Sequence, residues 1–332
     1  GTNWSDGDCY KWMEALTYTF AVTQAPELDA TLDKLIGVIA RAQDDDGYIC
    51  TQIQLDPQKS RWQRRNHHEL YNMGHLLTAA GVHHRVTGKD SFLVIARRLA
   101  DYLITVFGPQ PKELAHYGWN PSNIMGLVDL YRETQDPQYL DLAVTFVNMR
   151  GSEPWPTPPF SAGRGYDPDP GDQNQDRVPL RDEGNAVGHA VTATYLCAGA
   201  ADVAAETGEQ DLVEALERIW QSSTLRKMYI TGAVGTYHHG VSRRGDRVHE
   251  AYGLDYELPN ATAYNETCAN IGNAMWNWRM LQLTGDARYA DIVERIIYNA
   301  GLSPISIDGT RFCYTNPLRW HGEEHDRLSH DT

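Results

Sequence analysis

The sequence predicts an all-α fold, a toroid of helical hairpins of the (α/α)6 type. A Thr-Gln or Thr-Gly dipeptide recurs five times, each time between two segments whose apolar residues repeat at helical spacing. Each dipeptide with the two helical segments beside it indicates a helix–turn–helix unit of roughly forty residues. No strand-rich region interrupts these units before residue 303.

The turn of each hairpin has a local chemical explanation. Glycine after the last helical residue fits a C-cap, and the Asp, Pro or Glu that follows fits the start of the next helix. The turns are expected at Thr23-Gln24, Thr87-Gly88, Thr134-Gln135, Thr207-Gly208 and Thr284-Gly285.

Polar residues gather where the first helix of each hairpin begins. If these first helices run in parallel as an inner ring, their beginnings meet at one mouth. The beginnings are Asn3–Trp12, Asn66–His75, Asn120–Asn123, Glu183–His189 and Tyr264–Cys268. An (α/α)6 ring needs one hairpin more than the five counted here, so the toroid is predicted to be incomplete in this chain. Residues 1–332 are expected to form a single catalytic domain.

Three segments depart from the hairpin pattern. Residues 154–181 are rich in Pro, Gly and Asp and are interpreted as a lid or binding loop, with a disordered linker as the alternative. Residues 229–257 form a Gly- and charge-rich insert that contains Glu250. Near the end, residues 304–308 and 311–318 alternate like two short strands around Asp308-Gly309, which predicts a short β-hairpin.

Composition and charge exclude some classes of function. A net charge of −15 argues against a nucleic-acid partner, and no apolar run is long enough to span a membrane. The five cysteines are odd in number and widely spaced, so reduced thiols are expected. The chain begins without Met, and its compartment stays open between the cytoplasm and the periplasm of a bacterium.

The segment from Glu250 to Cys268 carries the strongest chemical signal. Glu266 and Cys268 are a carboxylate and a thiol two residues apart, and both groups bind Zn²⁺. On an ideal helix they would face opposite sides, so the pair makes sense only just before a helix begins. Glu250 is then free to move protons. The alternatives are a buried structural cysteine beside a capping glutamate, and a solvated acid at Glu250.

Several longer blocks resemble glycoside hydrolase family 127, the β-L-arabinofuranosidases. They are NHHELYNMGH, GNAVGHAVTATYL, MYITGAVG, YELPNATAYNETCANIG, ERIIYNAGLSPISIDG and RFCYTNPL, and the resemblance runs from Asp6 to Leu318. It implies an (α/α)6 barrel followed by β-sandwich domains. It also implies a zinc-dependent retaining exo-glycosidase that acts on terminal β-L-arabinofuranosides or a related plant-glycan sugar.

The resemblance also implies catalytic roles for individual residues. Glu250 matches the general acid/base, and Glu266 and Cys268 match two zinc ligands. The family's nucleophile is a zinc-bound cysteine in an adjacent pair that is expected beyond Thr332, so the chain is interpreted as a fragment. The polar tail contains the histidines His321, His325 and His330. These histidines are not favoured as replacements for the missing cysteine ligands, because the tail has no sequence pattern that would fix their geometry.

Five further positions are implied to bind substrate or to stand near the nucleophile. His68 and His189 match substrate-binding histidines, and Tyr314 matches a tyrosine placed near the nucleophile. At Asn120 the family's best-known member carries a histidine, and Asp6 lies in a segment that contributes sugar contacts. Without the resemblance, His189 fills the barrel centre as readily as it binds a sugar.

Two other functions share the predicted fold. A sugar epimerase or polysaccharide lyase on the same toroid would not need zinc at Cys268, and a non-catalytic relative would bind glycans without hydrolysing them. The expected partner in each case is an oligosaccharide or glycan. Neither a nucleic acid nor a membrane is expected as a partner, and a homodimer is compatible with the sequence.

Overall fold

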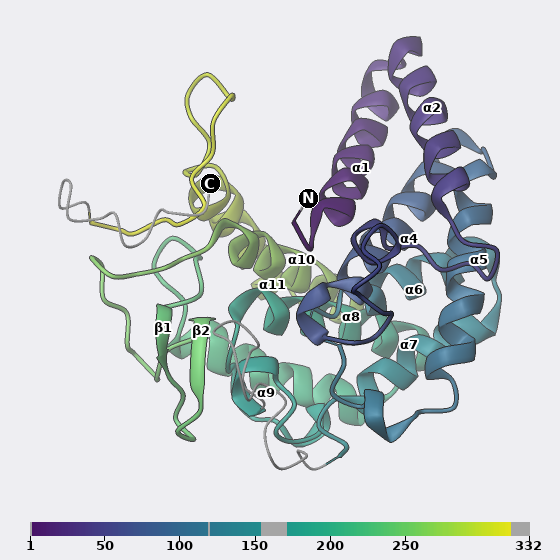
Figure 1. Cartoon of the computed structure of the whole chain (residues 1–332). Coiled ribbons are helices and arrows are strands. Elements are labelled where there is room, and N and C mark those ends of the chain that lie inside the picture. The colour runs from purple at the N-terminus through teal and green to yellow at the C-terminus, as the bar shows by residue number, and fades with distance from the viewer. Residues whose placement is uncertain (1, 119, 154–170, 320–332) are drawn as a thin grey trace. The chain divides into compact units, whose positions relative to one another are not determined.

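A computed structural model describes residues 2–118, 120–153 and 171–319 (Figure 1). The chain divides into two compact units, Gly1–Met149 and Arg150–Thr332, and each is described by itself. The part of the predicted loop at residues 154–170 and the tail histidines lie outside the described residues.

The N-terminal unit consists of three helical hairpins. The first helices α1, α4 and α6 pack side by side, and the second helices α2, α5 and α7 pack against them and against one another (Figure 1). The helices are α1 (Ser5–Thr23), α2 (Pro26–Ala42), α3 (Thr51–Gln54), α4 (Glu69–Thr87), α5 (Ser91–Phe107), α6 (Ser122–Thr134) and α7 (Pro137–Met149). Short 3-10 turns are η1 (Arg65–His67) and η2 (Lys112–Leu114).

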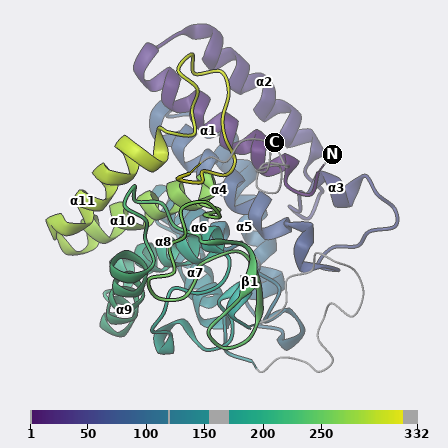
Figure 2. The same ribbon diagram turned by 90° about the vertical axis from the view of Figure 1, so that its left-hand side faces the viewer.

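The C-terminal unit continues the same plan with two hairpins. Helix α10 packs against α8 (Figure 2). Helix α11 packs against α10, and helix α9 packs against α8. The helices are α8 (Ala190–Thr207), α9 (Gln210–Arg226), α10 (Thr267–Thr284) and α11 (Ala287–Ile296), which ends in a π-turn, η5 (Ile297–Gly301). The 3-10 turns η3 (Gly171–Asn174) and η4 (Leu180–Asp182) precede α8.

The five predicted hairpin turns are confirmed. The residue after each threonine is left-handed, with φ of 71° at the three glycines and 55° and 58° at the two glutamines. Each threonine hydroxyl donates a hydrogen bond to the carbonyl four residues earlier; the threonines are Thr23, Thr87, Thr134, Thr207 and Thr284. The helix end and the turn are therefore fixed by the dipeptide itself.

Three of the first helices, α4, α6 and α8, are the most deeply buried elements. In α8 the buried residues occupy every face, from Ala190 to Ala204, because the helix is covered on several sides. Small side chains such as Ala193 and Ala200 allow its neighbours to approach closely.

None of the helices in the described part of the chain is long and apolar enough to span a membrane.

The all-α class is confirmed, but the β-structure lies elsewhere than predicted. The two-stranded antiparallel sheet is formed by β1 (Tyr237–Val241) and β2 (Arg247–Ala251), within the charged insert. The predicted hairpin around Asp308-Gly309 has its turn, yet it pairs only through the single bridge Ile305↔Phe312. Ile307 and Phe312 are exposed, so no packing extends that pairing into strands.

Candidate functional site

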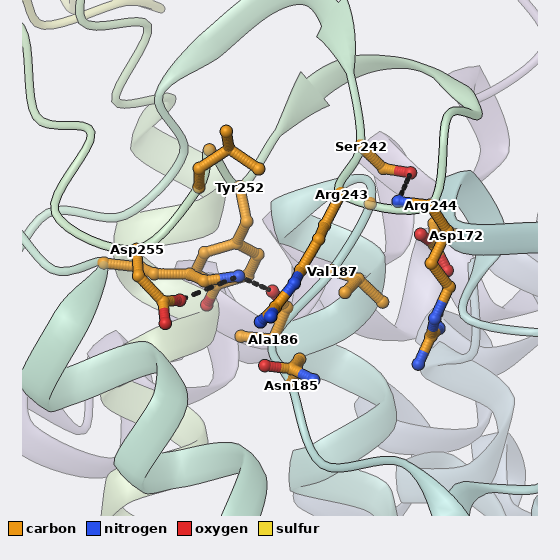
Figure 3. Close-up of a pocket in the computed structure, with 13 residues that line it drawn as sticks. Asp172, Asn185, Ala186, Val187, Ser242, Arg243, Arg244, Tyr252 and Asp255 are labelled. Carbon is orange, nitrogen blue, oxygen red and sulfur yellow. Dashed lines mark hydrogen bonds and ion pairs between the residues drawn. The ribbon is translucent and has the colours of Figure 1, made fainter.

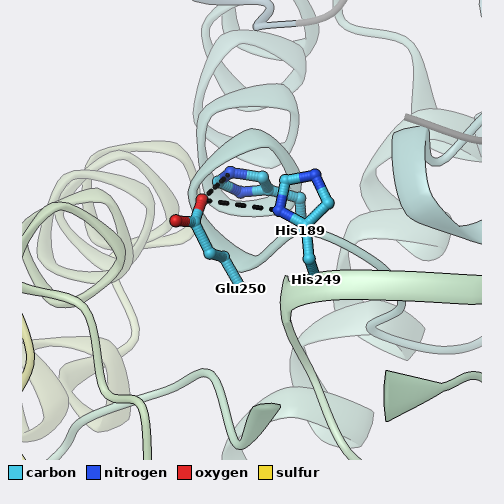
Figure 4. Close-up of side chains that lie close together, drawn as sticks. All are labelled: His189, His249 and Glu250. Atoms are coloured by element: carbon cyan, nitrogen blue, oxygen red, sulfur yellow. Dashed lines mark ion pairs between the residues drawn. The ribbon is translucent and has the colours of Figure 1, made fainter. Parts of the chain in front are cut away.

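Glu250 lies at the centre of a cluster of polar side chains in the C-terminal unit. Its Oε2 is 2.8 Å from Nε2 of His189 (Figure 4). Its Oε1 accepts a hydrogen bond of 2.8 Å from the Tyr264 hydroxyl. The backbone of Glu250 has a φ of 50°, which is uncommon for a residue other than glycine. Such a conformation persists only when the surroundings impose it, and functional sites are where it concentrates.

The histidines around Glu250 determine its charge. Burial alone would raise the pKa of this carboxyl, but the hydrogen bond from His189 and the nearby His249 outweigh burial and hold the pKa well below its usual range. Nδ1 of His249 is 3.7 Å from Oε2, which is longer than a good hydrogen bond, and His249 comes after His189 among the influences that lower this pKa. Glu250 is therefore a carboxylate at neutral pH.

The segment before α8 holds both histidines in place. The amide of Gln173 brackets the backbone of His249: Oε1 accepts from its N–H at 2.8 Å, and Nε2 donates to its carbonyl at 3.3 Å. The backbone carbonyl of Gln173 accepts the N–H of His189 at 3.0 Å. Gly188 has a φ of 68°, and a Cβ there would lie 1.7 Å from the carbonyl oxygen of Asp172. Glycine is therefore required beside His189.

These contacts change the interpretation of residues 154–181. The described part of this segment, from Gly171 onward, begins with buried residues that support the two histidines. For the rest of the segment, a lid function stays a prediction. No sequence signal singled out Gln173, His249 or Tyr264 for a role, although Tyr264 belongs to the fifth helix beginning.

Glu266 and Cys268 stand where α10 begins, as predicted. Glu266 is the N-cap residue, with a non-helical ψ of 134°, and Cys268 is the second residue of the helix. The preceding Asn265 is left-handed, with a φ of 44°, and its N–H is bonded to the carbonyl of Gly235. The carboxylate and the thiol are therefore brought to the same side, which an uninterrupted helix would prevent.

The Glu266 carboxyl has the properties expected of a metal ligand. Its side chain is buried, and its Oε2 has no hydrogen-bond partner among the described residues. Burial and the charge of Glu250 raise its pKa to about 7, although contacts with Tyr314 and Cys268 oppose the increase. A buried carboxylate with a free oxygen beside a thiol fits a zinc ion, so the residues present are compatible with the predicted metal.

Tyr314 borders the same cluster. Its backbone carbonyl accepts the N–H of Thr267 at 2.9 Å, which ties the segment after Gly309 to the start of α10. Burial and the charges of Glu266 and Glu250 raise the pKa of its hydroxyl far above the usual value. The hydroxyl therefore stays protonated and is a hydrogen-bond donor.

His189, His249 and Glu250 are also close enough to ligate a metal together. One ligand atom from each lies within 4.8 Å of the other two. A tetrahedral zinc ion with bonds of about 2.0 Å would separate two such ligands by about 3.3 Å. The 2.8 Å between His189 and Glu250 is shorter and matches a direct hydrogen bond from the imidazole N–H to the carboxylate.

The remaining predicted substrate-binding residues belong to the N-terminal unit. His68 precedes α4 in a left-handed conformation, with Nδ1 2.6 Å from the carbonyl of Asn66. Asn120 is buried and accepts a hydrogen bond from the N–H of Ser122. Asp6 accepts from the backbone and the hydroxyl of Thr51, so both of its oxygens already hold α1 to α3. Their contacts with a sugar stay predictions.

A second buried carboxylate, Glu69, was not anticipated from the sequence. It lies at the start of α4 and accepts hydrogen bonds from Tyr48 at 2.6 Å, from Tyr117, and from the N–H of Trp62. Burial raises its pKa, and these hydrogen bonds only partly oppose the increase. This carboxyl is a structural element of the N-terminal unit.

Comparison with solved structures identifies the class of fold first. A D-mannose isomerase has a TM-score of 0.57 at 12% sequence identity and covers 94% of this chain and 80% of its own. A cellobiose 2-epimerase from Bacillus thermoamylovorans has a TM-score of 0.54 at 10% identity, covering 93% and 79%. At these identities the likeness establishes the α/α-toroid fold and nothing of the chemistry.

Closer relatives define the family. The model of the GH127 catalytic domain of β-L-arabinofuranosidase matches residues 1–332. A non-reducing end β-L-arabinofuranosidase of Bifidobacterium longum is 35% identical over 353 residues, covering 99% of this chain and 52% of that protein. A GH127 β-L-arabinofuranosidase from Geobacillus stearothermophilus T6 has a TM-score of 0.87 at 38% identity, covering 98% and 51%. A structure described as a glycoside hydrolase has a TM-score of 0.82 at 44% identity, covering 96% and 50%.

This chain belongs to glycoside hydrolase family 127, as its sequence blocks predicted. It spans about half the length of the relatives it matches. The family match covers both compact units. A single catalytic domain over residues 1–332 would give such a match, and this domain assignment stays a prediction.

Proposed function

We propose that this chain forms the toroidal part of an exo-glycosidase that removes terminal β-L-arabinofuranosyl residues, or a related plant-glycan sugar, with retention of configuration. The observation that carries the proposal is the placement of Glu250, which is fixed at both oxygens by His189 and Tyr264. The named activity of the Bifidobacterium relative supports the choice of sugar.

In this proposal Glu250 transfers protons to and from the glycosidic oxygen. Its low pKa suits the second step, in which a carboxylate removes a proton from water. The first step needs a proton on the carboxyl, and His189, whose Nε2 is 2.8 Å from Oε2, is positioned to pass one to it when its imidazole carries two protons, which leaves the imidazole neutral. His189 would then act as a proton partner of Glu250 as well as a sugar-binding residue.

Glu266 and Cys268 would hold a zinc ion, with the remaining ligands and the cysteine nucleophile contributed by the part of the protein that follows Thr332. A bound zinc ion would keep a cysteine ligand deprotonated at neutral pH. Tyr314, protonated and adjacent to Glu266, would donate a hydrogen bond toward that thiolate. His68, Asn120 and Asp6 are proposed to contact the sugar.

Replacement of Glu250 by glutamine in the whole protein tests the proposal. Glu250→Gln is expected to reduce kcat/KM on aryl β-L-arabinofuranosides by roughly two to three orders of magnitude. The loss should be largest for poor leaving groups, because these depend most on protonation. Glu294→Gln, on the exposed face of α11, is the matched control and should keep full activity. A loss under tenfold in Glu250→Gln, or no dependence on the leaving group, would contradict the proposed role.

A further inference from the structure

A cavity of about 320 Å³ lies within the C-terminal unit, beside the candidate site (Figure 3). Its walls come from the segment before α8, the end of α9, the turn between β1 and β2, and the residues after β2. None of the described residues assigned above to proton transfer or to zinc lines it. The volume is within the range of small-molecule sites.

Two cations face this cavity. Lys227 is buried, and its Nζ donates one hydrogen bond of 2.7 Å to the carbonyl of Ala186. The carboxylate of Asp255, at the rim, is 3.8 Å from Nζ, which is beyond hydrogen-bond length. Arg243 extends along the cavity toward Asn185 (Figure 3), and no described residue forms an ion pair with it.

The other charges of the cavity wall are already compensated. Arg244 is bonded to Asp172 at 2.7 Å and to Glu183 at 2.9 Å. Asp172 also receives Arg177 at 3.4 Å. Asp255 is shared between Lys227, at 3.8 Å, and Arg226, at 3.4 Å, and Arg243 has no ion pair among the described residues. An excess of positive charge therefore lies at the Lys227 and Arg243 side, although the whole chain has a net charge of −15.

We propose that this cavity binds the carboxylate of a monosaccharide-sized hydroxy acid, such as a hexuronate, between Lys227 and Arg243. Burial is the largest influence that lowers the pKa of Lys227, and Asp255 opposes it. Repulsion from Arg226 and from Arg243 adds to the lowering, so Lys227 and Arg243 repel one another. A carboxylate between them turns this repulsion into two attractions. The side-chain amide of Asn185 offers a donor and an acceptor to hydroxyl groups.

The position of the cavity couples it to the candidate site. Val187 and Gly188 line it immediately before His189, and Tyr252 lines it two residues after Glu250. The N–H of Tyr252 is bonded to the carbonyl of Gly188 at 3.0 Å, so the two walls are joined. A ligand in the cavity would contact the segments that carry His189 and Glu250. The choice of a sugar acid rests on the proposed function, whereas the choice of a carboxylate rests on the cavity alone.

Calorimetric titration of the whole protein with D-glucuronate tests the proposal without requiring catalysis. Saturable binding is expected, with D-glucose and acetate each binding at least about tenfold more weakly. Arg243→Gln should weaken glucuronate binding at least about tenfold. Arg295→Gln, an exposed arginine of α11, is the matched control and should bind as the unaltered protein does.

Hydrogen–deuterium exchange places the ligand. Glucuronate should slow exchange in residues 185–188 and 252–255, and Arg243→Gln should abolish that protection. The proposal is overturned if glucuronate does not bind, if glucose or acetate binds as tightly, or if Arg243→Gln binds glucuronate unchanged. Loss of hydrolytic activity plays no part in these outcomes, so failure of the cavity and failure of the proposed function are distinguishable.

Discussion

Gln173 is the residue whose removal tests most directly how the site is held together. The Gln173→Ala change deletes two hydrogen bonds to the backbone of His249, at 2.8 Å and 3.3 Å, from a side chain that is 1% exposed. Each backbone group left without a partner costs about 1–3 kcal/mol when it is buried. Because His249 itself is only partly buried, the lower end applies, and the total is about 2 kcal/mol.

This cost is local and is measured best by hydrogen exchange in β2. A loss of about 2 kcal/mol corresponds to roughly thirtyfold faster exchange for amides that open locally. Peptides covering residues 247–252 should show this acceleration by mass spectrometry, whereas Gln138→Ala, an exposed glutamine of α7, should leave them unchanged. Acceleration below threefold in Gln173→Ala would refute the argument that this side chain supports β2. Activity should fall at least about tenfold as well, because Glu250 follows His249.

Two further predictions concern the buried carboxylate Glu69 and the predicted zinc ligand Cys268. Burial raises the folded-state pKa of Glu69, so the contribution of this carboxyl to stability is fully present below its ordinary pKa of 4.5 and is lost as the pH rises through the folded value. In urea unfolding, Glu69→Gln should therefore gain stability relative to the unaltered protein between pH 4.5 and pH 7.5. Parallel pH dependences of the two proteins would contradict this. Cys268→Ser should lower the zinc content of the whole protein at least about tenfold by elemental analysis, whereas substitution of the exposed Cys9 by serine should not. If Cys268→Ser holds as much zinc as the unaltered protein, Cys268 is excluded as a ligand.

The hairpins were predictable because their turns are chemically local. A threonine that bonds back into the helix and a left-handed residue after it determine where one helix ends, whatever the tertiary structure. The position of Glu266 and Cys268 at a helix start was predictable for the same reason, since two residues on an extended backbone can share a side and two on a helix cannot.

The support of the site was not predictable, because its contacts are distant in sequence. Gln173 and His249 are 76 residues apart, and neither has a neighbour that marks it. The sheet was also missed, although its loop contains Gly245 with a φ of 88°, a turn residue of the kind that joins hairpin strands. The alternation at residues 304–318 looked more regular, but exposed side chains such as Ile307 leave those segments nothing to pack against.

Glu250 and Glu266 have opposite protonation tendencies, and this difference assigns their roles better than their spacing in the sequence does. Glu266 is buried and Glu250 is partly buried, and the charge of Glu250 raises the pKa of Glu266. The imidazoles beside Glu250 keep it ionised, while Glu266 has a pKa of about 7. Two carboxyl groups pushed apart in this way perform different tasks. With Glu250 ionised, a cation at the free oxygen of Glu266 would favour the charged form of that carboxyl, so a metal at Glu266 is compatible with a carboxylate at Glu250.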